Sequence, residues 1–264
     1  MADISMTESK QSLGVGSILS ESFSIFFSNF LKVLLLGAFG ALLGVLINTM
    51  FLGFNAAVGV GDPNITDPSA VITGSVLSIV VNTMIYGLVT ALLIQLAYDA
   101  KLGRSNSLGT YFNAAIPAVV PIAVLSIVVF VLMMIGAVAL LIGMLWVYAV
   151  FYVMPPVAVI ERGGFGSLGR SAALTKEYRW PIVGLFILIM ILTMVVQVVA
   201  TFLVGVLIAM GGASLAGPVL AAIAFAVISG ISYAFGGIAI ALVYARLREI
   251  KEGVNVDHIA SVFD

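Results

Sequence analysis

Five long runs of apolar residues dominate this sequence. Four of them have at least the length of one membrane-spanning helix, because about 20 apolar residues cross the hydrocarbon core of a bilayer. These four cover Leu31–Phe54, Val71–Tyr98, Pro181–Met210 and Pro218–Ala245. The fifth run, Ala114–Ile160, holds no charged residue and is too long for one crossing. We predict two helices there, folded back on each other near Gly136–Gly143, and therefore six spans in all.

The composition agrees with a membrane protein. Hydrophobic residues make up 62% of the chain and charged residues 9%, whereas soluble domains are about half apolar and a quarter charged. A formal net charge of −1 provides no basic field for nucleic acid. The absence of cysteine excludes disulfides, thiolate catalysis and cysteine-based metal sites. The first apolar run is too long for a signal peptide, so we expect it to remain as a span.

The basic residues define the expected orientation. With six crossings, all eleven fall on one side of the membrane, and the other side holds a loop that is acidic through Asp62 and Asp67. The positive-inside rule then places both termini in the cytoplasm, whereas five crossings would scatter the basic residues over both sides. The basic residues are Lys10, Lys32, Lys101, Arg104, Arg162, Arg170, Lys176, Arg179, Arg246, Arg248 and Lys251.

We predict an all-α fold, a polytopic integral membrane helix bundle with interfacial amphipathic helices. The whole chain, 1–264, forms one membrane domain: a cytoplasmic tail and interfacial helix over 1–30, the six-helix bundle over 31–245, and a cytoplasmic tail over 246–264. A second interfacial helix is expected just before Trp180, which itself lies at headgroup level. The apolar stripe that predicts the first interfacial helix consists of Val15, Ile18, Leu19, Phe23, Phe26, Phe27 and Phe30.

One motif suggests a nucleotide site. GFGSLG, at Gly164–Gly169, has the G-x-G-x-x-G spacing of dinucleotide-binding loops. That chemistry needs a strand before the loop, a crossover helix after it and an acidic residue about 20 positions further on. A predicted membrane helix precedes this motif, and an apolar run occupies the later position. We therefore interpret the motif as a turn and expect no cofactor. The tripeptide SLG also occurs at Ser12 and Ser107, which indicates a weak internal repeat.

The interiors of the predicted spans carry neutral polar side chains and no ionisable ones. Four amides, Asn48, Asn82, Gln95 and Gln197, are candidates for a buried polar cluster. They either form hydrogen bonds between helices or line a polar cavity for a lipid head or a small solute. The pairs Gly40-x-x-x-Gly44 and Ser232-x-x-x-Gly236 predict close helix contacts.

A second group of candidates lies at the predicted cytoplasmic surface. These residues either contact an anionic headgroup or a partner, or provide the positive charge that fixes topology. They are Glu161, Arg162, Arg170, Lys176, Arg179 and Trp180. His258 is a lone histidine with no second ligand nearby, so we expect no metal site there.

The run PPVAVIERGGFGSLGRSAALTKEYRWPIVGL, the opening GSILSESFSIFFSNF and the closing ALVYARLREIKEGVNVDHIASVFD resemble one family. They are similar to bacterial membrane proteins related to the membrane domain of glycerophosphoryl diester phosphodiesterases. The resemblance implies a six-helix module in the bacterial cytoplasmic (inner) membrane, here stand-alone and without the catalytic domain. It assigns no activity.

Three hypotheses for function follow. The first is a non-enzymatic accessory or scaffold subunit that packs against other membrane proteins, with membrane lipids as further partners. The alternative is a lipid-handling or small-solute permease, which a continuous polar cavity lined by Asn82, Gln95 and Gln197 would favour. A membrane enzyme is the weakest hypothesis, because the spans hold no paired carboxylates, no nucleophile with its base and no metal-ligand cluster.

Overall fold

The computed structural model describes residues 11–58, 61–62, 67–211 and 216–253. Within these ranges all regular structure is helical, and six helical segments are long and apolar enough to cross a membrane. They are α2 (Phe30–Leu52), α4 (Pro68–Lys101), α5 (Leu108–Gly136), α6 (Leu140–Phe151) continued by α7 (Met154–Ile160), α9 (Arg179–Gly211) and α10 (Ala216–Glu252). The predicted all-α, six-span membrane bundle is confirmed.

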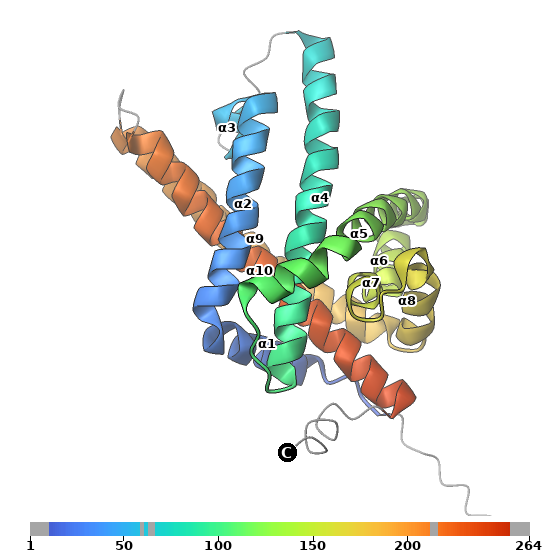
Figure 1. Ribbon diagram of the computed structural model, residues 1–264. Coiled ribbons are helices and arrows are strands. Elements are labelled where there is room, and N and C mark those ends of the chain that lie inside the picture. The colour runs from blue at the N-terminus through green and yellow to red at the C-terminus, as the bar shows by residue number, and fades with distance from the viewer. Residues whose placement is uncertain (1–10, 59–60, 63–66, 212–215, 254–264) are drawn as a thin grey trace, which may run out of the picture.

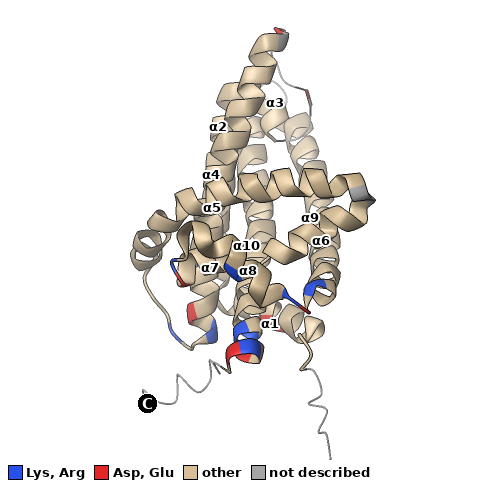
Figure 2. Cartoon of the chain, turned by 90° about the vertical axis from the view of Figure 1, so that its right-hand side faces the viewer, with Lys and Arg blue, Asp and Glu red and all other residues tan. Residues whose placement is uncertain are grey.

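The spans form two layers of different inclination. Helices α2 and α4 run side by side, and α9 and α10 form a second pair that crosses them diagonally (Figure 1). Helix α5 is steeply inclined to α4 in both views and returns as α6 (Figures 1 and 2). The predicted fold-back is confirmed, because the short turn η1 (Ala137–Ala139) joins the two helices and Gly136 packs against the backbone of Gly143.

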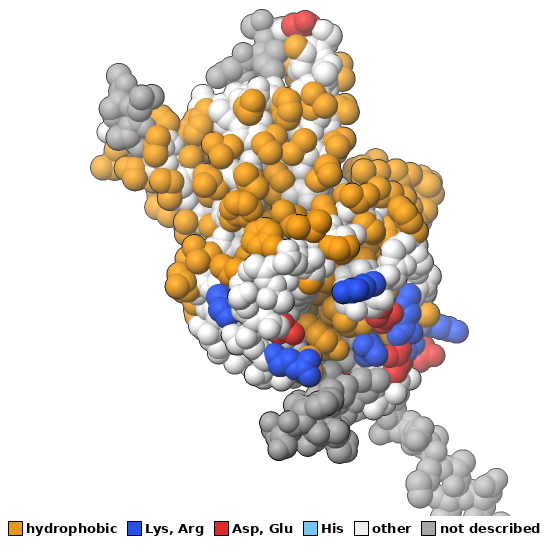
Figure 3. Space-filling model, in the orientation of Figure 1, with side chains coloured by type: hydrophobic (Ala, Val, Ile, Leu, Met, Phe, Trp, Pro, Cys, Tyr) orange, Lys and Arg blue, Asp and Glu red, His pale blue; other side chains and the backbone are white. Residues whose placement is uncertain are grey.

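Charged side chains are segregated along the bundle. Every described Lys and Arg lies at the end where α1 and α8 are found, and Asp62 and Asp67 lie at the opposite, acidic end (Figures 2 and 3). Asp67 caps α4, since its carboxylate accepts a hydrogen bond from the Ser69 backbone N–H at 2.9 Å. The hydroxyl of Ser69 also donates to this carboxylate and lowers the pKa of Asp67.

Two short helices lie at the charged end. Helix α1 (Val15–Ser28) runs across the bottom of the bundle and buries Ile18, Ile25 and Phe26 (Figure 1). The chain bends at Asn29, so Phe30 begins α2 and does not continue the stripe of α1 as the periodicity predicted. Helix α8 (Ser167–Thr175) is the second interfacial helix.

The boundaries of the last two spans differ slightly from the sequence pattern. Helix α9 begins at Arg179, two residues before Pro181, so the proline falls within the first turn, where a missing N–H breaks no helical hydrogen bond. Helix α10 continues past Ala245 to Glu252 and carries its basic last turns out of the apolar region. The SLG at Ser107 caps α5 directly, with no separate interfacial helix before the span.

The fourth span is broken next to its two prolines. Helix α6 ends at Phe151, and Pro155 and Pro156 have no N–H to donate to the carbonyls of Phe151 and Tyr152, four residues earlier. The neighbouring carbonyl of Val150 accepts hydrogen bonds from the Ser171 hydroxyl at 3.0 Å and the Thr175 hydroxyl at 2.9 Å, both on α8. The interfacial helix therefore supplies the donors that the broken span needs.

Glycines set the closest helix crossings. A Cβ on Gly37 of α2 would lie 2.3 Å from the carbonyl oxygen of Gly230 on α10, and a Cβ on Gly40 would lie 2.1 Å from a methyl of Val89 on α4. The predicted close contact at Gly40 is confirmed. The prediction for Gly236 is wrong, because its Cβ would meet nothing within 4 Å, and its neighbour Gly237 is the glycine that packs against Leu93.

We expect Gly37→Ala and Gly230→Ala to destabilise the bundle by about 1–3 kcal/mol, because each methyl would meet backbone atoms that cannot move aside. Gly184→Ala, on an exposed face with nothing within 4 Å, is the control and should not destabilise. Thermal unfolding in mild detergent measures the difference. Equal Tm values for all three variants would contradict the close crossing.

The double variant Ser171→Ala/Thr175→Val should destabilise the protein by about 1–3 kcal/mol, because it leaves the half-buried Val150 carbonyl without these donors. Thr83→Val is the control, since the Thr83 hydroxyl bonds only to the Ile79 carbonyl of its own helix in the described structure. Hydrogen exchange of the α6–α7 segment reports the effect. If the double variant and the control behave alike, α8 does not support the helix break.

Candidate functional site

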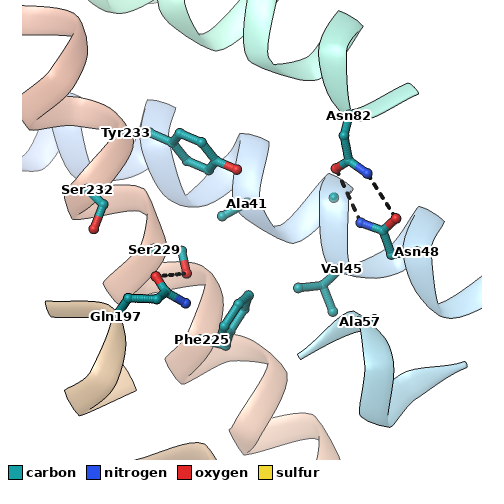
Figure 4. Close-up of a pocket in the computed structure, with 11 residues that line it drawn as sticks. Ala41, Val45, Asn48, Ala57, Asn82, Gln197, Phe225, Ser229, Ser232 and Tyr233 are labelled. Carbon is teal, nitrogen blue, oxygen red and sulfur yellow. Dashed lines mark hydrogen bonds between the residues drawn. The ribbon is translucent and has the colours of Figure 1, made fainter. Parts of the chain in front are cut away.

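A cavity of about 340 Å³ lies between α2, α4, α9 and α10, on the acidic side of the Gly37–Gly230 crossing. The short helix α3 (Phe54–Ala57) folds back from the end of α2, and Ala57 lines the cavity. The remaining apolar lining comes from Ala41, Gly44, Val45 and Phe225, and the polar lining from Asn48, Asn82, Gln197, Ser229, Ser232 and Tyr233. Figure 4 shows these side chains converging from several helices.

The polar groups form two hydrogen-bonded sets on either side of the cavity (Figure 4). Asn48 and Asn82 donate to each other's amide oxygens at 3.2 and 2.9 Å, and Asn82 also donates to the Ser78 carbonyl at 2.7 Å. On the other side, the Ser229 hydroxyl donates to the Gln197 amide oxygen over a longer 3.5 Å. The first set is well satisfied, whereas the second is only weakly bonded.

One hydroxyl of the cavity has no partner in the described structure. The Oγ atom of Ser232 is buried and forms no hydrogen bond. A buried hydroxyl without a partner costs about 1–3 kcal/mol, and this oxygen is covered by protein atoms on the cavity side.

The structure brings together three of the four predicted amides. Asn48, Asn82 and Gln197 share the cavity, but Gln95 does not belong to the cluster. Gln95 lies thirteen residues beyond Asn82 on the same helix, a rise of about 20 Å. It lines a separate pocket of about 210 Å³ near the charged end, together with Asp99 and Arg162.

Sequence reasoning missed Tyr233 as a lining residue. The signal is present in the spacing, because Ser229, Ser232 and Tyr233 stand at i, i+3 and i+4 and therefore share one face of α10. No charged residue lines the cavity in the described structure. Its chemistry is limited to amide and hydroxyl donors and acceptors beside an aromatic ring, which suits hydrogen bonding to an uncharged group.

The predicted headgroup cluster separates into distinct contacts. Arg170 is held between two carboxylates: its guanidinium bonds Glu161 at 3.0 and 3.1 Å and also bonds Glu252. Glu161 further accepts from the Tyr244 hydroxyl at 2.9 Å, and Glu252 accepts from Arg248 at 2.8 Å. The hydrogen bond to Glu161 raises the pKa of Arg170. This network ties α7 and α8 to the end of α10.

The other predicted surface residues lie apart from that network. Arg162 lines the pocket of Gln95, and Lys176 is exposed just after α8. The guanidinium of Arg179 lies 5.2 Å from the ring centroid of Trp146, and Trp180 packs 5.3 Å from the same ring. The six residues therefore do not form one anion site, because the Arg170 charge is matched within the protein and Arg179 stacks on an aromatic ring.

The GFGSLG motif forms the 3-10 turn η2 (Gly164–Gly166) and the start of α8. The Ser167 hydroxyl bonds to the Gly164 carbonyl at 2.7 Å, and a helix precedes the motif. The described residues thus lack the strand that a dinucleotide loop requires. They also hold no group of three His, Asp or Glu residues that could bind a metal ion. His258 lies outside the described residues.

The chain was compared with known proteins at three levels. No model of a protein family, no curated protein and no solved structure matches it. The site is therefore assigned from its own geometry.

We expect Arg170→Met to free the C-terminal end of α10 from α8 and to raise the hydrogen exchange of residues 167–175 about fivefold, which corresponds to about 1 kcal/mol for these partly exposed ion pairs. The pKa of Arg170 is raised above the ordinary arginine value in the folded protein. Its contribution to stability is therefore fully present below that ordinary value and is lost only as pH rises through the higher folded-state pKa. The increase should therefore be equal at pH 7 and pH 9.

Lys176→Met is the control for this measurement, because Lys176 is exposed and its replacement removes the same single positive charge. An increase of the same size in this variant would show that general charge, and not the Glu161–Arg170–Glu252 network, holds α8.

Proposed function

We propose that this membrane protein binds a small uncharged hydrogen-bonding group in the cavity between α2, α4, α9 and α10 and lets it move through the bilayer. This corresponds to a lipid-handling or small-solute permease. The observation that carries the proposal is the cavity itself: about 340 Å³, lined by three amides and three hydroxyls from four spans. Ligand pockets typically begin at about 300 Å³.

The absence of charge defines the ligand class. A charged group would lose its hydration in the bundle interior with no opposite charge among the described lining residues to compensate it. An uncharged hydroxyl or amide can exchange hydrogen bonds with Gln197 and Ser229 at much smaller cost. The described lining of the cavity also contains no acid and base pair, which supports a function without catalysis.

The proposed location follows from charge. Because the described basic residues gather at one end of the bundle, we place that end and both termini in the cytoplasm. A bacterial cytoplasmic (inner) membrane and a relation to the membrane domains of glycerophosphoryl diester phosphodiesterases remain predictions, supported by the resemblance of residues 155–185.

A second candidate function is an accessory or scaffold subunit. It is favoured by α9, which has the smallest buried share of the six spans, 22%. Its exposed face presents Met194, Val198 and Phe202, which are available to lipid or to a helix of another membrane protein. A stoichiometric protein partner after gentle extraction from the native membrane would support this alternative.

The chain has no cysteine, so single cysteine variants can report on the cavity without background. In proteoliposomes, the Ala41→Cys variant, which places a thiol in the cavity wall without removing a polar lining group, should react with N-ethylmaleimide, a small neutral reagent, and glycerol should slow this reaction. Glycerol at about four times its Kd slows labelling about fivefold. The Ser126→Cys variant is the control, because Ser126 is half-buried on α5 and lies outside the cavity. Its rate of labelling should not change with glycerol.

Two results would contradict the proposal. The first is an Ala41→Cys variant that does not react, which would mean that the cavity excludes small neutral molecules. The second is a reaction that neither glycerol nor a lipid with a glycerol head can slow. Ala57→Leu adds a second test, because it fills the cavity without removing any described hydrogen bond and should abolish the protection.

A further inference from the structure

A second depression adjoins the polar cavity. It is an apolar groove of about 270 Å³ between α1, α9 and α10. Its walls include Phe23, Phe27 and Phe30, which are 39%, 66% and 44% exposed, so the groove is open to the surrounding lipid. The ring of Phe23 packs 4.5 Å from that of Phe235, which joins α1 to α10 beside the groove.

Ser232 lies between the two depressions, because it lines both of them. Along α9 the lining changes from apolar to polar between two neighbouring residues, since Val196 lines the groove and Gln197 lines the cavity. The buried Ser232 hydroxyl without a partner thus lies where the polar and the apolar linings meet. A ligand that filled both would have its polar part on one side of this hydroxyl and its apolar part on the other.

We infer that the cavity and the groove are the two halves of one site for a lipid with a small uncharged head and a long alkyl chain, such as a monoacylglycerol. This inference rests on the proposed function and names its substrate class. The head would bond Gln197 and Ser229, and the chain would lie along the phenylalanines of α1. Neither half carries a charged side chain among its described lining, so the match in charge and polarity is complete.

The position of the two halves fits a lipid whose head has left the headgroup layer and lies among the spans. The groove lies toward the charged end, where α1 crosses the bundle, and the cavity lies on the acidic side of the Gly37–Gly230 crossing. The head is therefore enclosed among the spans while the chain faces the bilayer. A polar head can cross an apolar layer in this arrangement without losing its hydrogen bonds.

The test uses the Ala41→Cys variant in proteoliposomes, with N-ethylmaleimide as reagent and either glycerol or 1-monopalmitoylglycerol as protecting molecule. Each should slow labelling about fivefold at about four times its Kd. Val196→Trp, added to this variant, should fill the groove and return labelling in the presence of 1-monopalmitoylglycerol to within about twofold of the unprotected rate. Protection by glycerol should remain.

Val199→Trp is the matched control, because Val199 is 49% exposed on α9 and does not line the groove. It should leave both kinds of protection intact. If 1-monopalmitoylglycerol fails to protect while glycerol does, or if Val196→Trp does not weaken its protection, the lipid assignment is wrong and the proposed function stands. If neither molecule protects, the proposed function fails as well.

Discussion

The crossing of α2 over α10 at Gly37 and Gly230 is the contact on which the rest of the bundle depends. Because neither residue has a side chain, the two backbones approach closely enough that a single methyl would collide with a carbonyl. In lipid, where apolar side chains gain little from leaving the solvent, such close packing is a main source of helix association. Beyond the crossing the helices diverge toward the acidic end (Figure 1), and the polar cavity lies between them.

Apolar packing holds the helices together at the acidic end, and polar contacts of α8 hold them at the charged end. Val45, Val58 and Val204 form a small buried cluster beside the cavity, with α3 as its cover. At the other end, α8 gives hydroxyl donors to the broken fourth span and holds α10 through Arg170. The hydrogen-bonding demands of the backbone thus position the interfacial helix, and the ion pairs lie where water can screen them.

The sequence predicts the spans well, because their length and the placement of charge are local signals. The faces that meet are harder to predict, since helices that are apolar all round carry no periodic signal to show which side is inside. Asn82 and Gln95 look equivalent in sequence, yet the crossing places one in the cavity and the other near the charged end. Glu252, the second partner of Arg170, lies 82 residues away and has no local signal at all.

The two sides of the cavity have different roles in recognition. Asn48 and Asn82 satisfy each other with two hydrogen bonds, at 3.2 and 2.9 Å, so a ligand gains little by competing with them. Gln197 and Ser229 share one long hydrogen bond, and the Ser232 hydroxyl has no partner in the described structure. Binding free energy is therefore available on the α9–α10 side, which is also the side that borders the groove. A neutral head bound there has its alkyl chain directed toward lipid by the same two helices, so recognition of the head and of the chain depends on one helix pair.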